Sequence, residues 1–308
     1  MKKASEPIVF FGSGPVAAES LRLLSQNFTI EAVVTKPRPP HHHGDVPVLA
    51  LTEKLQLPAY TAATHRELDT LIMSKHFSSR LAILIDFGII VSQKVIDYFK
   101  LGIINSHFSL LPEWRGADPI TFSILSGQKR TGVSLMLLTA GMDEGPLLAQ
   151  STFDIPPDMT TPELTDALII QSYKALCQIV PLYVIGEAQP AAQEAVTFAA
   201  SSVPTYSRRL AKEDGIIDWR KPAAVIEREI RAFAGWPQSR SRMGDLDIII
   251  TKAHVTPTQG EAGKAVALAK QLVIYAGTDA LTIERIKPAG KKEMTGEAFL
   301  AGYKKLLG

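Results

Sequence analysis

The chain contains 308 residues, enough for two domains or one large domain at about 100–200 residues per domain. Hydrophobic residues make up 46% and charged residues 21%, a composition typical of a globular protein. The single cysteine, Cys177, excludes an intrachain disulfide and a CxxC metal or redox motif. We find neither a signal peptide nor an apolar run of about 18 residues, and we therefore expect a cytoplasmic protein without a membrane-spanning helix.

The charge is divided unevenly along the chain. The formal net charge of +2 combines −4 over residues 1–203 with +6 over residues 204–308. An acidic body joined to a basic tail indicates an anionic macromolecular partner. Such a surplus also occurs on surfaces whose charge only maintains solubility, so the pattern alone leaves both interpretations open.

Short apolar runs alternate with helix-like segments through the first part of the chain. Near-continuous apolar strands in such an alternation predict a parallel sheet covered on both faces. Ser92 is placed to cap the helix that follows it, and Thr161, Pro162 and Glu163 are typical of a helix start. We expect strands over residues 8–11, 30–34, 59–60, 81–87, 102–104, 132–138 and 147–153, and helices over residues 16–26, 47–55, 92–99 and 161–184.

The pattern changes near residue 186. Residues 187–204 are rich in Ala, Gln, Pro and Ser, and we interpret them as a linker between a domain of residues 1–186 and another of residues 205–308. Short strands separated by Gly- and Pro-containing turns predict a small β-barrel or sandwich in the second domain. Its expected elements are a helix over residues 223–233 and strands over residues 246–251, 265–268, 272–275 and 281–286, with Trp219 and Trp236 in its core.

One glycine-rich motif resembles a nucleotide site. Residues 12–17, GSGPVA, follow a strand and open a helix, as in the G-x-G-x-x-G/A pattern of dinucleotide sites. The acidic residue expected about 20 residues later is missing, although Lys36 and Arg38 would suit an NADP phosphate. Because Pro15 removes a backbone donor that a phosphate would use, we favour a turn that needs glycine for steric reasons.

Residues 41–43 are three consecutive histidines, a composition that suggests metal binding. Consecutive side chains do not converge on one ion without a special turn, and Pro39, Pro40 and Gly44 flank the segment. We therefore expect an exposed loop and no metal site.

The strongest candidate site combines Asn105, His107 and Asp143. Asn105 and His107 lie at the end of an expected strand, where open α/β folds place their sites, and their spacing of two puts them on one face. Asn105 can donate a hydrogen bond to a carbonyl oxygen, His107 can transfer a proton, and Asp143, in a Gly-bounded turn, can orient the imidazole. The trio suits acyl transfer. From the spacing alone, ordinary turn and loop roles for the three residues fit equally well.

A longer segment around this trio decides between the two interpretations. Residues 105–120, NSHFSLLPEWRGADPI, resemble the signature of the folate-dependent formyltransferases, in the version carried by the methionyl-tRNA formyltransferases. Asp143, 36 residues after His107, stands where that family places its catalytic aspartate. Residues 206–219, 230–237 and 287–294 resemble motifs of its second domain, so that the resemblance covers nearly the whole chain. It implies an α/β fold: a Rossmann-like formyltransferase domain followed by a smaller β-barrel of OB type.

The implied reaction moves a formyl group from 10-formyltetrahydrofolate, the co-substrate, to the α-amine of methionyl-initiator-tRNA. Asn105 and protonated His107 would stabilise the tetrahedral oxyanion, and His107 would carry the proton from the amine to the leaving N10. Asp143 would orient His107 and favour its charged form. The family also implies a monomer.

The resemblance further implies two sets of binding residues. Folate would lie against Phe87, Gly88, Ile89, Ile90, Ser109, Leu110, Leu111, Pro112, Gly141 and Met142. The tRNA would contact Lys36, Arg38, Arg208, Arg209, Lys212, Lys287, Lys291 and Lys292.

The chain departs from the family pattern in four places. Asp86 replaces a common alanine in the folate loop, Phe108 a small residue and Glu113 a basic one. Residues 36–44 are a shorter and less basic form of the loop with which the tRNA enzymes reach the acceptor end. These departures bear on the choice of acceptor more than on formyl transfer.

Three other functions fit parts of the sequence. A formyltransferase acting on a small amine, such as an amino sugar nucleotide or glycinamide ribotide, would share the trio but not the basic second domain. An NADP-linked oxidoreductase would need the missing ribose-binding acid. A catalytically dead tRNA-binding module would not need the intact trio.

Overall fold

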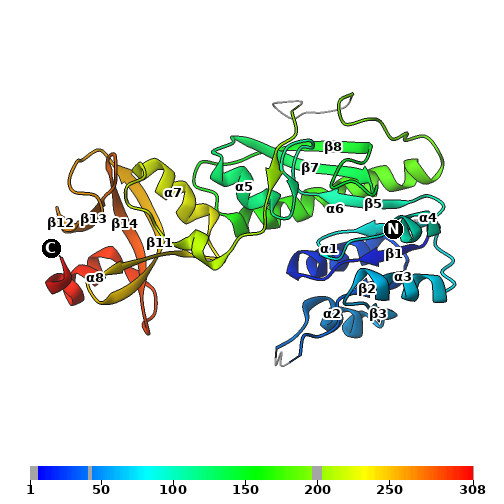
Figure 1. The fold of residues 1–308 in the computed structure, drawn as a ribbon, viewed down its shortest axis with the longest axis horizontal. Coiled ribbons are helices and arrows are strands. Elements are labelled where there is room, and N and C mark those ends of the chain that lie inside the picture. Colours follow the sequence, from blue (N-terminus) through cyan, green and yellow to red (C-terminus); the bar gives the residue numbers. More distant parts are fainter. Residues whose placement is uncertain (1–5, 41–43, 196–202, 308) are drawn as a thin grey trace. The chain divides into compact units, whose positions relative to one another are not determined.

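The computed structural model of the protein describes residues 6–40, 44–195 and 203–307 (Figure 1). Its chain divides into two compact units. Unit 1 contains residues 1–119, 130–154 and 165–207, and unit 2 contains residues 120–129, 155–164 and 208–308.

Unit 1 is built on a seven-stranded sheet with the strand order β3-β2-β1-β4-β5-β7-β8. The strands from β3 to β5 are parallel, and β7 and β8 extend the sheet beyond β5 as antiparallel strands. The five parallel strands confirm the parallel sheet that the alternation of strands and helices predicts, and the sheet as a whole confirms the Rossmann-like domain that the resemblance implies. The strands are β1 (Ile8–Phe11), β2 (Ile30–Thr35), β3 (Ala59–Thr61), β4 (Leu81–Leu84), β5 (Ile103–His107), β7 (Arg130–Leu137) and β8 (Leu147–Asp154).

Most of the helices agree with the sequence prediction, and one that it missed has a recognisable start. The hydroxyl of Thr64 accepts a hydrogen bond from the amide of Glu67, whose carboxylate in turn accepts from the amide of Ala63. Thr64 is therefore the N-cap, and the sequence T-x-x-E is typical of such a helix start. The helices are α1 (Pro15–Asn27), α2 (Pro47–Leu55), the unpredicted α3 (His65–Ser74), α4 (Gln93–Tyr98), the unpredicted α5 (Pro119–Leu125) and α6 (Thr161–Val184).

The strand β5 presents functional and structural side chains on opposite faces. The hydroxyls of Ser106 and of Ser172 on α6 share a hydrogen bond of 2.6 Å. Because side chains alternate along a strand, Asn105 and His107 point to the other face.

Helix α6 packs through residues spaced by four. Leu168, Ser172, Leu176 and Val180 are each at most 1% exposed. By length and composition this helix could also cross a membrane, since an 18-residue window has a mean hydropathy of 1.3 with 28% of it buried. The helix is not the continuous apolar run whose absence the sequence analysis noted, because it contains Gln171, Lys174 and Gln178. One such helix is weak evidence for a membrane, because core helices of soluble proteins meet the same criterion.

Unit 2 contains an antiparallel sheet with the order β10-β11-β14-β13-β12, to which β15 is added beside β14. Its core gathers aliphatic side chains from the sheet and from two helices, of which the sequence predicted only α7. Trp219 packs against this core, whereas Trp236 is 58% exposed, so the prediction of a core position for Trp236 was wrong. The elements are α7 (Ala223–Ala232), β10 (Ser239–Met243), β11 (Leu246–Thr256), β12 (Ala265–Leu268), β13 (Gln271–Tyr275), β14 (Ala280–Pro288), β15 (Met294–Thr295), α8 (Gly296–Tyr303) and the 3-10 helices η1 (Lys212–Gly215) and η2 (Lys304–Leu306).

Helix α8 places a fully buried aromatic ring in this core. Phe299 is fully buried and stacks on Tyr303 with ring centroids 4.6 Å apart. Truncating a buried phenylalanine removes its transfer free energy and leaves a cavity. We expect Phe299→Ala to lower the free energy of unfolding by about 3–5 kcal/mol in urea titrations. Phe299→Leu, which keeps most of the volume, should cost clearly less; equal losses would mean that packing at this position is unimportant.

Candidate active site

The structure brings Asn105, His107 and Asp143 together. Nδ1 of His107 lies 3.7 Å from Oδ2 of Asp143, and Nδ2 of Asn105 donates to Oδ1 of Asp143 at 3.3 Å. Asn105 is 9% exposed and His107 is 6% exposed. Polar groups enclosed in this way interact more strongly than they would in water.

Asp143 lies in the turn between β7 and β8. Its φ of 53° is left-handed, a conformation that aspartate tolerates better than most residues. The amide of Gly116 donates to its Oδ2 at 2.7 Å. Gly145 closes the turn where a Cβ atom would come within 1.8 Å of the carbonyl oxygen of Leu137, so only glycine fits. The carboxylate is therefore held by a backbone amide on one oxygen and by the Asn105 side chain on the other.

His107 is fixed on its other side as well. Its Nε2 lies 2.9 Å from the carbonyl oxygen of Trp114. A carbonyl oxygen can only accept, so this contact places a hydrogen on Nε2 and leaves Nδ1 as the nitrogen that gains or loses a proton.

The predicted linker contributes to this site within unit 1. Gln193 is 2% exposed, and its Nε2 donates to the carbonyl oxygens of Asp143 at 2.7 Å and Gly145 at 3.0 Å. Further along, Thr205 accepts a hydrogen bond on its hydroxyl from the amide of Trp114, and β9 (Tyr206–Ser207) pairs with β6 (Arg115–Gly116). Residues 196–202 of the predicted linker lie outside the described residues.

The predicted folate residues divide into exposed and enclosed groups. Ile90 is 81% and Met142 is 64% exposed, so both present apolar surface to a ligand. Strand β4 ends at Leu84, so its predicted end at Phe87 was three residues too late, and the chain then turns through positive φ values of 48° at Asp86 and 65° at Gly88. The side chains of Phe87, Ser109, Leu110, Leu111 and Pro112 are buried, while Ile89 and Gly141 are half-buried.

Buried residues of the signature segment serve its own folding. Oγ of Ser134 donates to the carbonyl oxygen of Ser109 at 2.7 Å and accepts from the amide of Leu111 at 3.0 Å. Phe108 and Glu113, two of the departures from the family pattern, are 7% and 5% exposed. Neither side chain is presented to solvent.

Backbone amides of the glycine-rich motif are already hydrogen-bonded to neighbouring backbone carbonyls. The amide of Gly12 donates to Val34, and that of Ser13 donates to Asp86. A Cβ atom on Gly12 would lie within 2.8 Å of Phe10, Ala17 and Ile85. These contacts support the steric interpretation of the motif over a phosphate site.

Lys36 lies close to the folate loop rather than alone on the surface. A Cβ atom on Gly88 would be 2.8 Å from its Nζ. Arg38 donates to the carbonyl oxygen of Gly44 at 3.1 Å, which holds the two ends of the loop together. Residues 41–43, the three histidines, lie outside the described residues, and within the described part no group of three His, Cys, Asp or Glu side chains could hold a metal ion.

The predicted basic residues of unit 2 lie in different surroundings. Arg208 makes a bidentate pair with Asp214 at 2.6 and 2.7 Å, and this arginine holds the pKa of the Asp214 carboxyl down at about 2. Arg209 and Lys212 are exposed on the adjoining segment, and Lys291 and Lys292 are exposed on the turn after β14.

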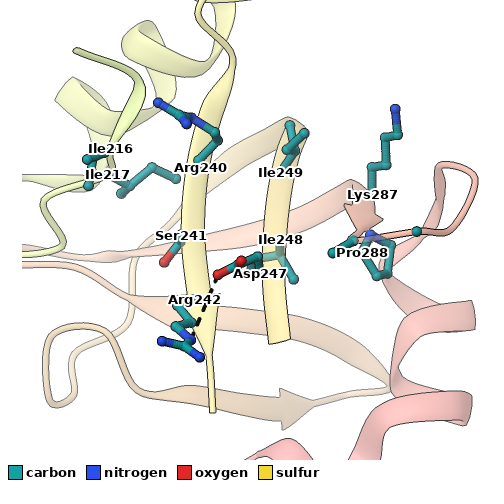
Figure 2. Close-up of a pocket in the computed structure, with 12 residues that line it drawn as sticks. Ile216, Ile217, Arg240, Ser241, Arg242, Asp247, Ile248, Ile249, Lys287 and Pro288 are labelled. Carbon is teal, nitrogen blue, oxygen red and sulfur yellow. Dashed lines mark ion pairs between the residues drawn. The ribbon is translucent and has the colours of Figure 1, made fainter. Parts of the chain in front are cut away.

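Lys287 lines a groove of about 690 Å³ in unit 2. Figure 2 shows Arg240 and Arg242 on one strand, Asp247 and Ile249 on the next, and Lys287 near the end of a third. Arg242 lies 3.8 Å from Asp247, and both side chains are largely exposed. Sequence reasoning missed Arg240 and Arg242, although their spacing of two on a strand places them on one face.

Two family models match the chain. The Formyl transferase model covers residues 8–180, and the model for the formyl transferase C-terminal domain covers residues 209–304. Together they span most of the sequence, and the chain therefore belongs to the formyl transferase family. A methionyl-tRNA formyltransferase of Chloroflexus aggregans is 34% identical over 306 residues, which are 96% of this chain and 96% of the relative. Such identity over nearly the full length places the chain among the methionyl-tRNA formyltransferases.

Solved structures share the fold. An N-formyltransferase from Helicobacter canadensis, in complex with folinic acid and dTDP-3-aminofucose, has a TM-score of 0.67 and 18% identity, covering 92% of this chain and 99% of that one. HypX from Aquifex aeolicus, in complex with tetrahydrofolic acid, has a TM-score of 0.64 and 15% identity, covering 97% of this chain and 47% of that one. At these identities the likeness shows the fold alone.

One departure from the family pattern has a measurable consequence. Dehydration by surrounding protein atoms raises the pKa of the Asp86 carboxyl from 3.8 to about 6, Lys36 opposes the rise, and Asp118 adds to it. Because the folded-state pKa exceeds the unfolded one, the contribution of the Asp86 carboxyl to the free energy of unfolding is fully present below pH 3.8 and is lost as the pH rises through about 6. Part of the carboxyl reaches solvent, which reduces the effect.

We expect Asp86→Asn to raise the melting temperature by a few degrees at pH 8 and by less at pH 5, because asparagine carries no charge to dehydrate. Thermal unfolding at both pH values measures the difference. Asp158→Asn, at an exposed loop position, serves as the control and should shift both temperatures equally. If Asp86→Asn shifts the melting temperature equally at pH 5 and pH 8, the raised pKa of Asp86 is contradicted.

Proposed function

We propose that the chain transfers the formyl group of 10-formyltetrahydrofolate to the α-amine of methionyl-initiator-tRNA, giving N-formylmethionyl-tRNA. The observation that carries this proposal is the enclosed contact of Asn105, His107 and Asp143 in a chain of this family. The substrate amine is itself the nucleophile, so the protein needs an oxyanion donor and a proton carrier but no nucleophilic side chain.

The contacts of His107 assign its proton to one atom. The amine nitrogen attacks the formyl carbon, and its surplus proton passes to Nδ1 of His107, since Nε2 is held by Trp114. When the bond between the formyl carbon and N10 breaks, the same proton moves to N10. Asp143, 3.7 Å away, stabilises the imidazolium that exists between these two steps.

Asn105 stabilises the intermediate from the other side. Its Nδ2 carries two hydrogens, of which one is donated to Asp143. The second is available to the oxyanion of the tetrahedral intermediate. A fixed donor in a nearly closed site costs no reorganisation as the negative charge develops.

The folate donor would contact Gly88, Ile89, Ile90, Gly141 and Met142, where the chain offers turn backbone and exposed apolar side chains. The enclosed Phe87, Ser109, Leu110, Leu111 and Pro112 would act by holding the same loops in place. Lys36, beside Gly88, is positioned at the folate loop, so its contact to tRNA would have to be made from there.

Unit 2 would supply sequence-independent contacts to the tRNA backbone. Arg242 and Lys287 on the groove of Figure 2 join Arg209, Lys212, Lys291 and Lys292 as exposed cations. Lysine and arginine bind phosphates chiefly by charge, which makes the affinity salt-dependent. Five further expectations stay predictions. They are the OB-type closure of the antiparallel sheet, the domain bounds 1–186 and 205–308, the cytoplasmic location, the monomeric state and the absence of a metal.

The decisive experiment offers both classes of acceptor. With 10-formyltetrahydrofolate as donor, the purified protein should formylate methionyl-initiator-tRNA and leave dTDP-linked amino sugars and glycinamide ribotide unmodified, as measured by transfer of a labelled formyl group.

His107→Ala should lower turnover by about 10²–10⁴-fold with little change in tRNA affinity, because a proton carrier contributes that much. Formylation of the small amines alone would overturn the proposed acceptor, and near-normal turnover by the variant would remove the role of His107.

The groove of unit 2 gives a separate test. Replacing Arg242 and Lys287 by alanine should weaken tRNA binding and reduce the slope of log affinity against log salt by about 0.9 for each phosphate that the variant no longer neutralises. Lys270→Ala, on the turn between β12 and β13, is the matched control. Filter binding at low and at moderate salt measures the slope. If the double variant and the control behave alike, the tRNA lies elsewhere.

A further inference from the structure

Gln193 occupies an unusual position for a residue of a linker. It follows α6 by nine residues and is 2% exposed, although both of its neighbours, Ala192 and Glu194, are exposed. The backbone beside it is anchored as well, since Ala191 and Leu147 exchange two hydrogen bonds of 2.7 and 2.9 Å. The segment is thereby joined to the start of β8, directly after the Asp143 turn.

Every hydrogen-bonding atom of the Gln193 carboxamide is used. Its nitrogen donates to the carbonyl oxygens of Asp143 and Gly145, and its oxygen accepts from Nη2 of Arg115 at 2.8 Å. An arginine can only donate and a carbonyl can only accept, so these three partners determine which end of the amide is which. A reversed amide would place oxygen against two carbonyl oxygens.

Arg115 in turn belongs to the signature segment. It is 6% exposed, and its Nη1 lies 3.2 Å from a carboxylate oxygen of Glu144, which is in the same turn as Asp143. The next residue, Gly116, donates its amide to the Asp143 carboxylate. The loop that follows β5 and the turn that follows β7 are thus cross-linked through the Gln193 amide.

We propose that Gln193 is a positioning residue of the formyl-transfer site, which sets the backbone of the Asp143 turn so that the carboxylate faces His107. It touches neither substrate nor the reacting atoms, and it acts through Asp143. The left-handed φ of Asp143 calls for outside support, because a residue in this sparsely populated region costs free energy and persists only where the surrounding structure holds it. The inference rests on the proposed function in one respect, namely that Asp143 serves His107.

Gln193→Glu is the most informative change. It keeps the size and the acceptor for Arg115 but replaces the two donors by an oxygen that repels the carbonyls of Asp143 and Gly145. We expect kcat to fall by between about 10- and 100-fold, because a displacement of about 1 Å costs that much, while KM for folate and the Kd for tRNA change little. Gln189→Glu is the matched control: Gln189 is exposed and bonds only Gly186 among the described residues, and the variant should keep normal kcat.

A double-mutant cycle separates positioning from general stability. In an Asp143→Ala background, Gln193→Glu should produce little further loss, because the residue through which it acts is gone. Equal losses in both backgrounds, or a normal kcat in the single variant, would overturn the positioning role. If the glutamate variant does not fold by circular dichroism, Gln193→Met, which removes the hydrogen bonds without adding charge, is measured in the same cycle.

The experiments distinguish a failure of the proposed acceptor from a failure of the positioning role of Gln193. The cycle is run with whichever amine the unaltered protein formylates, so a wrong acceptor leaves it readable. Should Asp143→Ala keep normal turnover, the proposed mechanism fails, and the positioning role fails with it. Should Asp143→Ala be impaired while Gln193→Glu is normal, the mechanism stands and only this inference is lost.

Discussion

The carboxylate of Asp143 is the point at which distant stretches of unit 1 meet. One oxygen accepts from Asn105 on β5, and the other accepts from Gly116 and faces His107. Asp143 makes these contacts with a left-handed φ of 53° in the turn between β7 and β8. The signature loop contacts its carboxylate, and the segment after α6 contacts its backbone carbonyl.

Enclosure and support are linked in this site. Burying polar side chains costs free energy unless each donor and acceptor is paired, and Gln193, Arg115 and the backbone of Trp114 provide those pairs. The second hydrogen of Asn105 and Nδ1 of His107 are left for the chemistry that requires them, whereas Nε of Arg115 is buried without a hydrogen-bond partner among the described residues.

Much of the fold and the composition of the site could be predicted from the sequence. Strict apolar runs predicted β1 and β2, and the long helix α6 begins and ends where expected, since its pattern is strong and its start is capped. The trio followed from strand-end placement and the family signature. Helix α3 was missed because its apolar face is short. Strand β4 was predicted too long because Ile85 and Phe87 continue its apolar run, although Asp86 between them has a positive φ. Gln193 could not have been found, because a lone glutamine in a polar segment acquires its meaning only from backbone carbonyls about fifty residues away.

The short parallel pairing of β6 with β9 has a consequence for modular engineering. Tyr206 and Ser207 are bound to Arg115 and Gly116, and Oγ of Ser207 accepts from the amide of Asp118 at 3.0 Å. A catalytic fragment truncated after α6 would lose both this pairing and Gln193. The junction for exchanging the basic tail between homologous proteins therefore lies after Ser207. A chimera joined nearer to Val184 would keep the Asp143 turn but lose this chain's own Gln193 and β9, which contact it and the signature loop.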